Sequence, residues 1–261
     1  MSIKRKILFL AANPKDTHRL KLDREVREIE KELRRSNIRQ TFEIKQQWAV
    51  RIEDLRHALL DYEPQIVHFS GHGQASELML EDDAGNTQRV VSQALVGLLE
   101  LFKTQIECVV LNACFSEPLA KALNEHIDYV IGMKDSISDT SASEFSVGFY
   151  AALCAGRSYL DAFKLGCNAI QFYDGQQHIT PIFLGKPNSL ENSQSEERND
   201  SCLELFPKTL SEESQTAYQL LIKKLNLLKT QYVVESDPTR KFQLNYQIEE
   251  AQKDLKRLET W

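Results

Sequence analysis

The amino-acid sequence predicts an α/β fold: a mostly parallel six-stranded sheet with helices on both faces, followed by a C-terminal α-helical hairpin. The first observation is that short apolar runs alternate with amphipathic segments over residues 6–184, an order typical of parallel sheets. The second is that the runs 107–112 and 129–133 are almost entirely apolar, as central parallel strands are. The third is that a polar segment separates this region from two further amphipathic segments.

Each expected strand is a short apolar run that ends in polar or turn-forming residues. The runs are residues 6–12, 40–46, 65–69, 107–112, 129–133 and 180–184. A hairpin is expected after the third run, because the apolar stretch 78–80 and Val90 flank the turn-forming residues 83–86.

Helices are expected where apolar residues recur at intervals of three and four. The first helix shows this spacing most clearly, at Leu22, Val26, Ile29 and Leu33. Ser92 is a candidate N-cap for the third helix, and Pro118 lies near the start of the fourth. We expect the other helices at residues 52–59, 142–155 and 158–172.

The chain is expected to contain two domains joined by a linker. Residues 1–187 form the α/β domain, and residues 188–201 are a linker, because a polar stretch with almost no apolar side chain cannot build a core. Residues 202–261 contain two amphipathic segments, separated by a helix-breaking sequence at 236–238. Each segment has one apolar seam, so the pair is expected to dock on the first domain, to self-associate or to bind another helical module.

The composition indicates an ordinary globular protein. The 261 residues carry a net charge of −6, which argues against a nucleic-acid partner and, more weakly, against an anionic membrane surface. The five cysteines include no C-x-x-C pair, so neither a disulfide framework nor a zinc site is expected. These features favour a cytoplasmic location, and the chemistry considered below requires no metal and no other cofactor.

A histidine and a cysteine follow two of the expected strands. His72 lies between two glycines after the strand at 65–69, and Cys114 lies just beyond the strand at 107–112. Because sites form at the carboxyl ends of parallel strands, these side chains are expected to meet. An imidazole beside a thiol can generate the thiolate that attacks an acyl group. The amides of Gly73 and Cys114 are candidate donors to the oxyanion that then forms.

Two motifs carry a family resemblance: His-Phe-Ser-Gly-His-Gly at 68–73 and Leu-Asn-Ala-Cys-Phe-Ser at 111–116. With Ile-Leu-Phe-Leu-Ala-Ala-Asn-Pro at 7–14 and the segments 139–150 and 162–164, they resemble the CHAT branch of the caspase-like cysteine peptidases. The resemblance covers residues 3–186 and implies that His72 is the general base and Cys114 the nucleophile. The residues around the cysteine depart from the usual caspase sequence, since Asn112 and Ser116 replace Gln and Gly.

The resemblance also implies a substrate pocket. Metacaspase-like relatives place an acidic residue two positions before the cysteine to receive a basic P1 side chain, and this chain has Asn112 there. Asp139, and less clearly Asp135, lies in the loop that completes the pocket in the family. The alternative for this loop is structural, with Asp139 or Ser141 capping the following helix. His68, which lies within its strand, is expected to pack against the sheet.

The resulting hypothesis is a caspase-like cysteine endopeptidase that cleaves protein substrates and is activated by a partner or by oligomerisation. Residues 202–261 are similar to the small helical adaptor modules of bacterial defence and signalling systems. The alternative is a catalytically silent CHAT-fold scaffold whose C-terminal hairpin mediates protein–protein interaction. A nucleotide-binding function is disfavoured, because no glycine-rich phosphate loop follows the first strand.

Overall fold

The fold was determined as a computed structural model. It describes residues 4–35, 42–74, 77–174 and 177–185, together with Asp200, Ser201, Arg240 and Gln247. The chain divides into two compact units, Met1–Glu204 and Leu205–Trp261. The helical hairpin expected over 202–261 and most of the linker expected over 188–201 lie outside the described residues.

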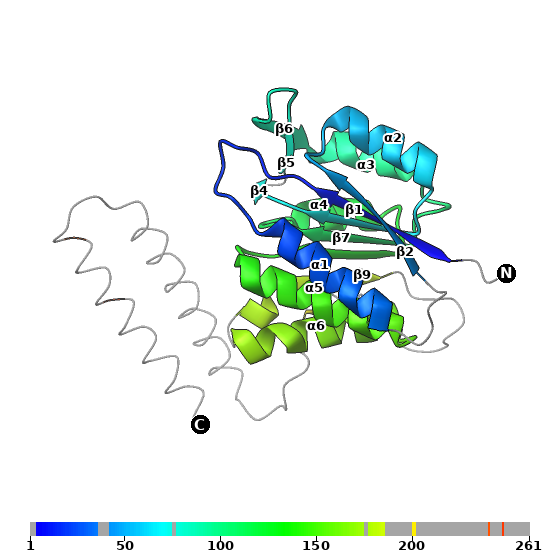
Figure 1. The fold of residues 1–261 in the computed structure, drawn as a ribbon, viewed down its shortest axis with the longest axis vertical. Coiled ribbons are helices and arrows are strands. Elements are labelled where there is room, and N and C mark those ends of the chain that lie inside the picture. Colours follow the sequence, from blue (N-terminus) through cyan, green and yellow to red (C-terminus); the bar gives the residue numbers. More distant parts are fainter. Residues whose placement is uncertain are drawn as a thin grey trace. The chain divides into compact units, whose positions relative to one another are not determined.

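A seven-stranded sheet forms the centre of the first unit, in the order β10-β9-β8-β7-β3-β1-β2 (Figure 1). In this order, the five neighbouring strands β8, β7, β3, β1 and β2 are parallel to one another. Strand β9 is antiparallel to β8 and to β10. The six expected strands are confirmed, and the two-residue β10 adds a seventh. The strands are β1 Arg5–Ala11, β2 Phe42–Trp48, β3 Ile66–Ser70, β7 Cys108–Asn112, β8 Tyr129–Met133, β9 Pro181–Gly185 and β10 Asp200–Ser201.

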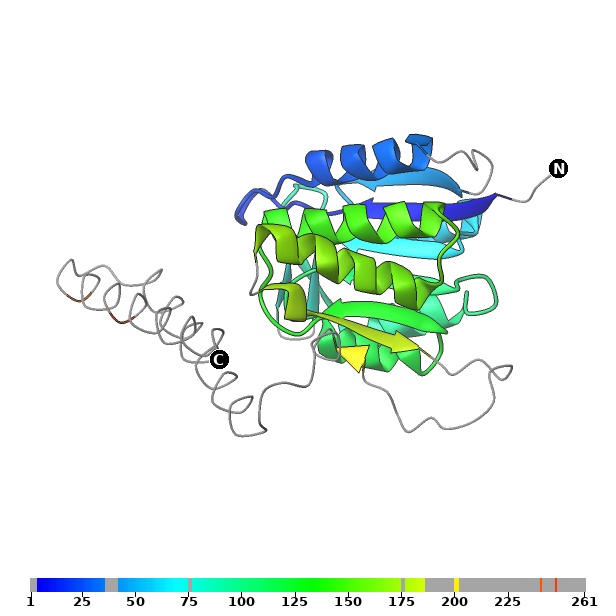
Figure 2. The ribbon, with the colours of Figure 1, turned by 90° about the horizontal axis from the view of Figure 1, so that it is seen from below.

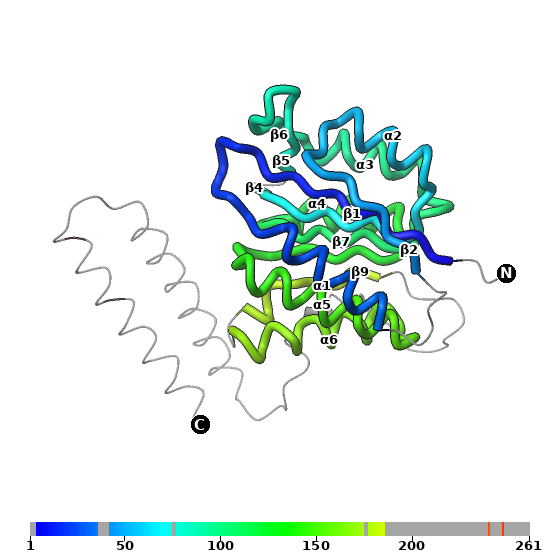
Figure 3. Tube along the Cα trace, viewed as in Figure 1, coloured from blue at the N-terminus to red at the C-terminus, as the bar shows by residue number. Residues whose placement is uncertain are grey.

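The expected hairpin after β3 is also present, as a small antiparallel sheet at one end of the large one (Figure 3). It contains β5 (Glu77–Glu81) and β6 (Thr87–Val91), which pair along their whole length. A two-residue strand, β4 (Gly73–Gln74), adds to β5 and begins directly after His72. The hairpin is therefore connected to the loop that carries the predicted base.

Helices cover both faces of the large sheet (Figure 2), as the strand and helix order predicts. One face is covered by α1 Leu22–Arg35, α5 Asp139–Cys154 and α6 Tyr159–Tyr173. The other is covered by α2 Ile52–Tyr62, α3 Ser92–Glu100 and α4 Glu117–Asn124, and the short 3₁₀ helix η1 is Gln177–Ile179. The prediction that Ser92 caps α3 is wrong, because Val91 holds the N-cap position and Ser92 is already helical.

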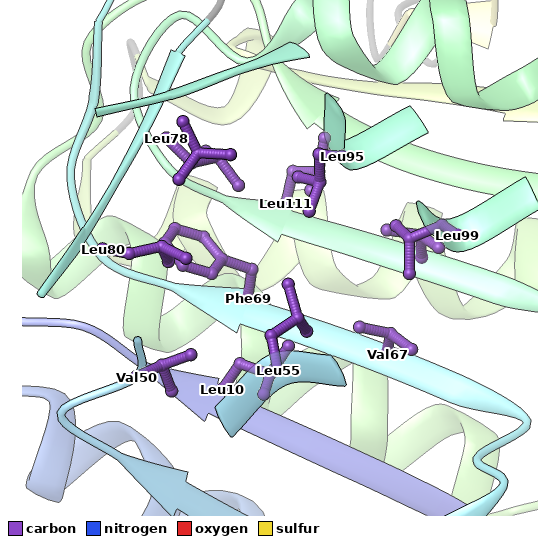
Figure 4. A pocket seen from close by; sticks show the side chains of 12 residues that line it. Leu10, Val50, Leu55, Val67, Phe69, Leu78, Leu80, Leu95, Leu99 and Leu111 are labelled. Atoms are coloured by element: carbon purple, nitrogen blue, oxygen red, sulfur yellow. The ribbon is translucent and has the colours of Figure 1, made fainter. Parts of the chain in front are cut away.

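The alternation of side chains along the strands produces two apolar cores. Leu8 and Leu10 of β1 face the layer of α2 to α4, whereas Ile7 and Phe9 face α1, α5 and α6. A small cavity remains in the first core (Figure 4), and all its lining side chains are apolar. It has no group that could carry chemistry, so it is a gap in packing. Within the described ranges, no helix is both long and apolar enough to cross a membrane.

Candidate active site

The register of the sheet brings the two predicted residues together. β3 and β7 are neighbours, and Ser70 at the end of β3 pairs with Asn112 at the end of β7. The loops that follow β3 and β7 therefore begin side by side at the same edge of the sheet, and Gly71 N donates to Asn112 O at 3.4 Å. His72 and Cys114, each two residues further on, line the same cleft.

Gly73 allows the two loops to approach closely. A Cβ atom at this position would lie 2.4 Å from the carbonyl oxygen of Cys114, so a larger residue would separate the loops. Met79 N donates to His72 O at 3.1 Å, which makes Gly73 and Leu78 a non-hydrogen-bonded pair of the antiparallel ladder. The Gly73 N–H therefore takes no part in this ladder.

One imidazole nitrogen of His72 is engaged by the main chain. Nε2 lies 2.7 Å from the carbonyl oxygen of His18, in the loop between β1 and α1. A carbonyl oxygen only accepts hydrogen bonds, so Nε2 must carry the proton. In the neutral imidazole Nδ1 is then unprotonated, which is the state that a general base requires.

The thiol of Cys114 is half-buried and contacts the loop between β8 and α5. Sγ accepts from Ile137 N at 3.4 Å and donates to Ile137 O at 3.7 Å. Burial is the largest influence on the thiol and raises its pKa; the Ile137 main chain opposes this, and the charges of Asp135 and Asp139 add to it. The thiol is therefore protonated at neutral pH in this arrangement.

The residue after the cysteine has an unusual backbone. Phe115 has a φ of 55°, a region that bulky side chains rarely adopt, and its N–H donates to Asp135 O at 3.3 Å. Phe115 is nevertheless 43% exposed, so burial of its ring does not explain the conformation. Strain of this kind is concentrated at functional sites, and here it shapes the turn that presents Cys114.

A buried carboxylate, that of Glu25, is among the groups that line the cleft, and sequence reasoning missed it. Glu25 of α1 is 3% exposed, and its carboxylate accepts from Asn112 Nδ2 and Ser146 Oγ, both at 2.7 Å, and from Ser70 Oγ. Burial would raise the pKa of Glu25, but His68 and the two hydroxyls outweigh it and hold the pKa below its usual value. A signal was available: Glu25 lies three residues after Leu22, on the apolar stripe of α1.

His68 packs inside the sheet, as predicted. It is fully buried, stacks on Phe9 with ring centroids 4.8 Å apart, and has Nδ1 3.1 Å from the Tyr150 hydroxyl. Its Nε2 lies 3.2 Å from Glu25 Oε1, close enough for electrostatic attraction but outside hydrogen-bond alignment. His68 therefore supports the buried carboxylate and does not reach the cleft.

The residues predicted for the substrate pocket divide into two groups. Asn112 and Asp139 line the cleft together with Cys114, whereas Asp135 is not among its lining residues. The structural alternative, in which Asp139 or Ser141 caps α5, is wrong, because Ser138 Oγ accepts from Ser141 N at the start of this helix. The carboxylate of Asp139 instead accepts from Lys21 N at 3.1 Å.

The other cysteines in the described part of the chain are not among the residues that line the cleft. Cys108 and Cys154 are buried thiols, and burial raises the pKa of Cys154 to about 11. Cys167 is disulfide-bonded, whereas the sequence predicts no disulfide framework. The described residues contain no group of three or more His, Cys, Asp or Glu side chains placed to hold a metal ion.

Comparison with known proteins identifies a family. The CHAT domain family model matches residues 2–165. A "Probable protease" from Gillisia limnaea is 28% identical over 171 residues, which cover 64% of this chain and 30% of that protein. A "Roc-COR-CHAT protease" from an unknown prokaryotic organism is 26% identical over 175 residues, which cover 64% of this chain and 16% of that protein. The chain thus spans less than a third of either relative.

The fold also has a solved counterpart. The crystal structure of the Arg-specific cysteine proteinase gingipain R resembles the chain with a TM-score of 0.52 at 14% identity, covering 70% of this chain and 46% of that one. At this identity the likeness shows the fold alone. Since the family match covers well over half of the sequence, this protein belongs to the CHAT domain family and has a caspase-like α/β fold.

Proposed function

We propose that the protein is a cysteine endopeptidase in which Cys114 is the nucleophile and His72 the general base. The observation that carries the proposal is that His72 and Cys114 line one cleft at the ends of paired strands. The His18 carbonyl supports it, because it leaves Nδ1 of His72 unprotonated. The protease names of the relatives agree with it.

In the proposed reaction, Nδ1 of His72 takes the proton from Sγ of Cys114 as the sulfur attacks the peptide carbonyl carbon. The amides of Gly73 and Cys114 stabilise the resulting oxyanion. The tetrahedral intermediate collapses, the peptide nitrogen takes the proton from His72, and the amine departs. Water, deprotonated by His72, then hydrolyses the thioester and restores the thiol.

Asn112 and Asp139 are proposed to bind the P1 side chain. Both line the cleft, and the carboxylate of Asp139 would favour a basic group. The orientation of Asn112 is defined, because Nδ2 donates to Glu25 and to Ala142 O at 3.0 Å. Its Oδ1, which has no partner among the described residues, is then the acceptor available to a P1 donor after a small opening of the cleft.

Activation by a partner or by oligomerisation through residues 202–261 completes the proposal, in the cytoplasm and in a bacterial signalling or defence system. The apolar seams of the sequence support it, as does a relative whose name joins CHAT to Roc and COR. The contact between Cys114 and Ile137 favours a resting state that needs such a signal. The same contact and the raised thiol pKa also support the rival function, a silent scaffold.

The test is alkylation of Cys114 by iodoacetamide across pH, located by peptide mass spectrometry. We expect Cys114 to react faster than the other cysteines below the free-thiol pKa of about 8.5, and His72→Ala to remove this advantage. His57→Ala is the matched control, because His57 is exposed on α2. If His72→Ala and the wild type react equally, the proposed base is wrong. If Cys114 reacts no faster than the other cysteines, with or without a helical partner, the scaffold function is favoured.

A further inference from the structure

The carbonyl that engages His72 belongs to a loop without regular secondary structure between β1 and α1. One side chain braces this loop. Asn13 Nδ2 donates to Leu20 O at 3.0 Å, and Asn13 Oδ1 accepts from Leu20 N at 3.1 Å. The amide thus binds both main-chain groups of one residue, two positions after His18, and closes the loop into a fixed shape.

The braced loop is also attached to its surroundings on two sides. Toward the β5–β6 hairpin, Asn13 N donates to Glu81 Oε1 at 2.9 Å, and Asp16 Oδ1 accepts from Thr87 N at 2.9 Å. Toward α5, Lys21 N donates to the carboxylate of Asp139. These contacts hold the ends of the loop, whereas among the described residues the side chain of Asn13 spans the stretch that contains His18.

We propose that Asn13 is a positioning residue for the base: by bracing Leu20, it places the His18 carbonyl against Nε2 of His72 and thereby selects the tautomer with Nδ1 unprotonated. The inference rests on the proposed function only in calling His72 the base. Its physical content is independent of that, because a carbonyl held 2.7 Å from Nε2 stabilises a proton on Nε2 in either case.

The two hydrogen bonds to Leu20 require a side-chain amide of the length of asparagine at position 13. Alanine at position 13 would remove both bonds to Leu20. Aspartate would keep the acceptor for Leu20 N but would place a carboxylate oxygen against Leu20 O, where a donor is needed. Without the brace the His18 carbonyl can move away, and either ring nitrogen of neutral His72 can then carry the proton.

The experiment is nitrogen NMR of the full chain labelled with ¹⁵N-histidine, in which long-range proton–nitrogen correlations distinguish the two tautomers. Loss of one signal set in His72→Ala assigns His72 among the six histidines. We expect wild-type neutral His72 to be protonated on Nε2, and Asn13→Ala to show the averaged nitrogen shifts of a mixture. Alkylation of Cys114 should fall in proportion to the fraction of His72 protonated on Nδ1, roughly twofold for an equal mixture, because an imidazole in the wrong tautomer cannot accept the thiol proton.

Arg19→Ala is the matched control, because Arg19 is an exposed neighbour of His18 in the same loop, and it should leave the tautomer unchanged. If Asn13→Ala does not fold, the tautomer of His72 is compared between Asn13→Asp and the wild type. A wild-type His72 protonated on Nδ1, or a folded Asn13 variant that keeps the wild-type tautomer, would overturn the proposal. Failure of the proposed function looks different: Cys114 would show no selective alkylation, while the tautomer would still depend on Asn13.

Discussion

The thiol of Cys114 is surrounded by groups that oppose its ionisation. Burial and two nearby carboxylates raise its pKa, and its hydrogen bonds go to Ile137 rather than to a cation. A stable thiolate–imidazolium pair is therefore disfavoured in the resting state. We infer that His72 takes the proton during the attack, and that the carboxylate of Asp139, which lines the cleft, attracts a basic substrate side chain.

Replacing Asp139 should separate its effect on the pKa of the Cys114 thiol from its proposed attraction of a basic substrate side chain. Asp139→Asn removes a negative charge near the thiol, which lowers the pKa of Cys114 and should speed alkylation by neutral iodoacetamide at pH 7 roughly two- to fivefold. Labelling by a peptide acyloxymethyl ketone with arginine at P1 should instead slow, because the cleft loses the carboxylate of Asp139.

Asp135 provides the matched comparison for Asp139. Its charge also raises the pKa of Cys114, but it is not among the residues that line the cleft. Asp135→Asn should therefore speed alkylation by iodoacetamide and leave the preference for an arginine probe over a leucine probe unchanged. If both variants change that preference equally, the assignment of Asp139 to the P1 pocket is incorrect.

At the scale of elements, the site depends on how closely two loops can pack. Gly73 is the closest point, and a methyl group there would meet the main chain of Cys114. Main-chain atoms cannot move aside as a flexible side chain can. The loops must then separate, which would displace both proposed oxyanion donors.

Gly73→Ala should therefore reduce selective alkylation of Cys114 by about tenfold or more, since small displacements of reacting groups are costly. It should also lower the midpoint of thermal unfolding. Gly97→Ala on α3 is the control, because a methyl group there meets nothing within 4 Å. It should leave alkylation unchanged and stabilise the helix by about 0.5–1 kcal/mol. Equal alkylation of Cys114 in the two variants would show that the loops of Gly73 and Cys114 can separate without reducing the reactivity of the thiol.

The start of α5 is a second element on which the site depends. Ser138 caps the helix through its bond to Ser141 N, and the next residue is Asp139 of the cleft. Ser138→Ala should destabilise the protein by about 1 kcal/mol in urea unfolding, whereas Ser138→Asp should keep most of the stability, because aspartate also caps helices. A loss of the same size in both variants would point to the hydroxyl's other contact, with Ser141 Oγ.

At the scale of the whole molecule, Glu25 connects elements that are distant in sequence. Its carboxylate is bonded to β3 through Ser70, to β7 through Asn112 and to α5 through Ser146. Helix α1 is thereby tied to two central strands directly beneath the cleft. A buried charge of this kind stabilises the fold only while its partners are in place.

Stability should therefore depend on the ionisation of Glu25. Its pKa is lowered in the folded protein, so the charged form stabilises the fold above the unfolded-state pKa of about 4.3, and this contribution is lost as pH falls toward the folded-state pKa. Glu25→Ala should cost about 3–5 kcal/mol at pH 7, because three buried donors lose their acceptor. Urea unfolding of the wild type and Glu25→Ala at pH 7 measures the cost of losing the acceptor. Urea unfolding of the wild type and Glu25→Gln at pH 7 and at pH 4 measures the pH dependence.

Asp23→Asn provides the comparison on the same helix. Its side chain is 71% exposed and pairs only with Arg27 among the contacts described, so the substitution should change stability little at either pH. If Glu25→Gln loses as much stability between pH 7 and pH 4 as the wild type, other carboxylates account for the acid sensitivity.

The sequence by itself determined the order of strands and helices and the positions of His72 and Cys114 at the ends of two strands. Both follow from local patterns, since apolar periodicity selects the elements and parallel strands align their carboxyl ends. It did not determine the direction of β9, because an apolar run of five residues pairs equally well in either direction.

Only the tertiary structure decided which groups surround the pair. The His18 carbonyl is a main-chain atom that every residue possesses, so no residue type in the sequence marks it as the partner of His72. Glu25 meets Asn112 across 87 positions of sequence, and such a contact depends on the crossing of α1 over the sheet. Local patterns specify which face of an element is buried, whereas the partners met on that face depend on how the whole chain packs.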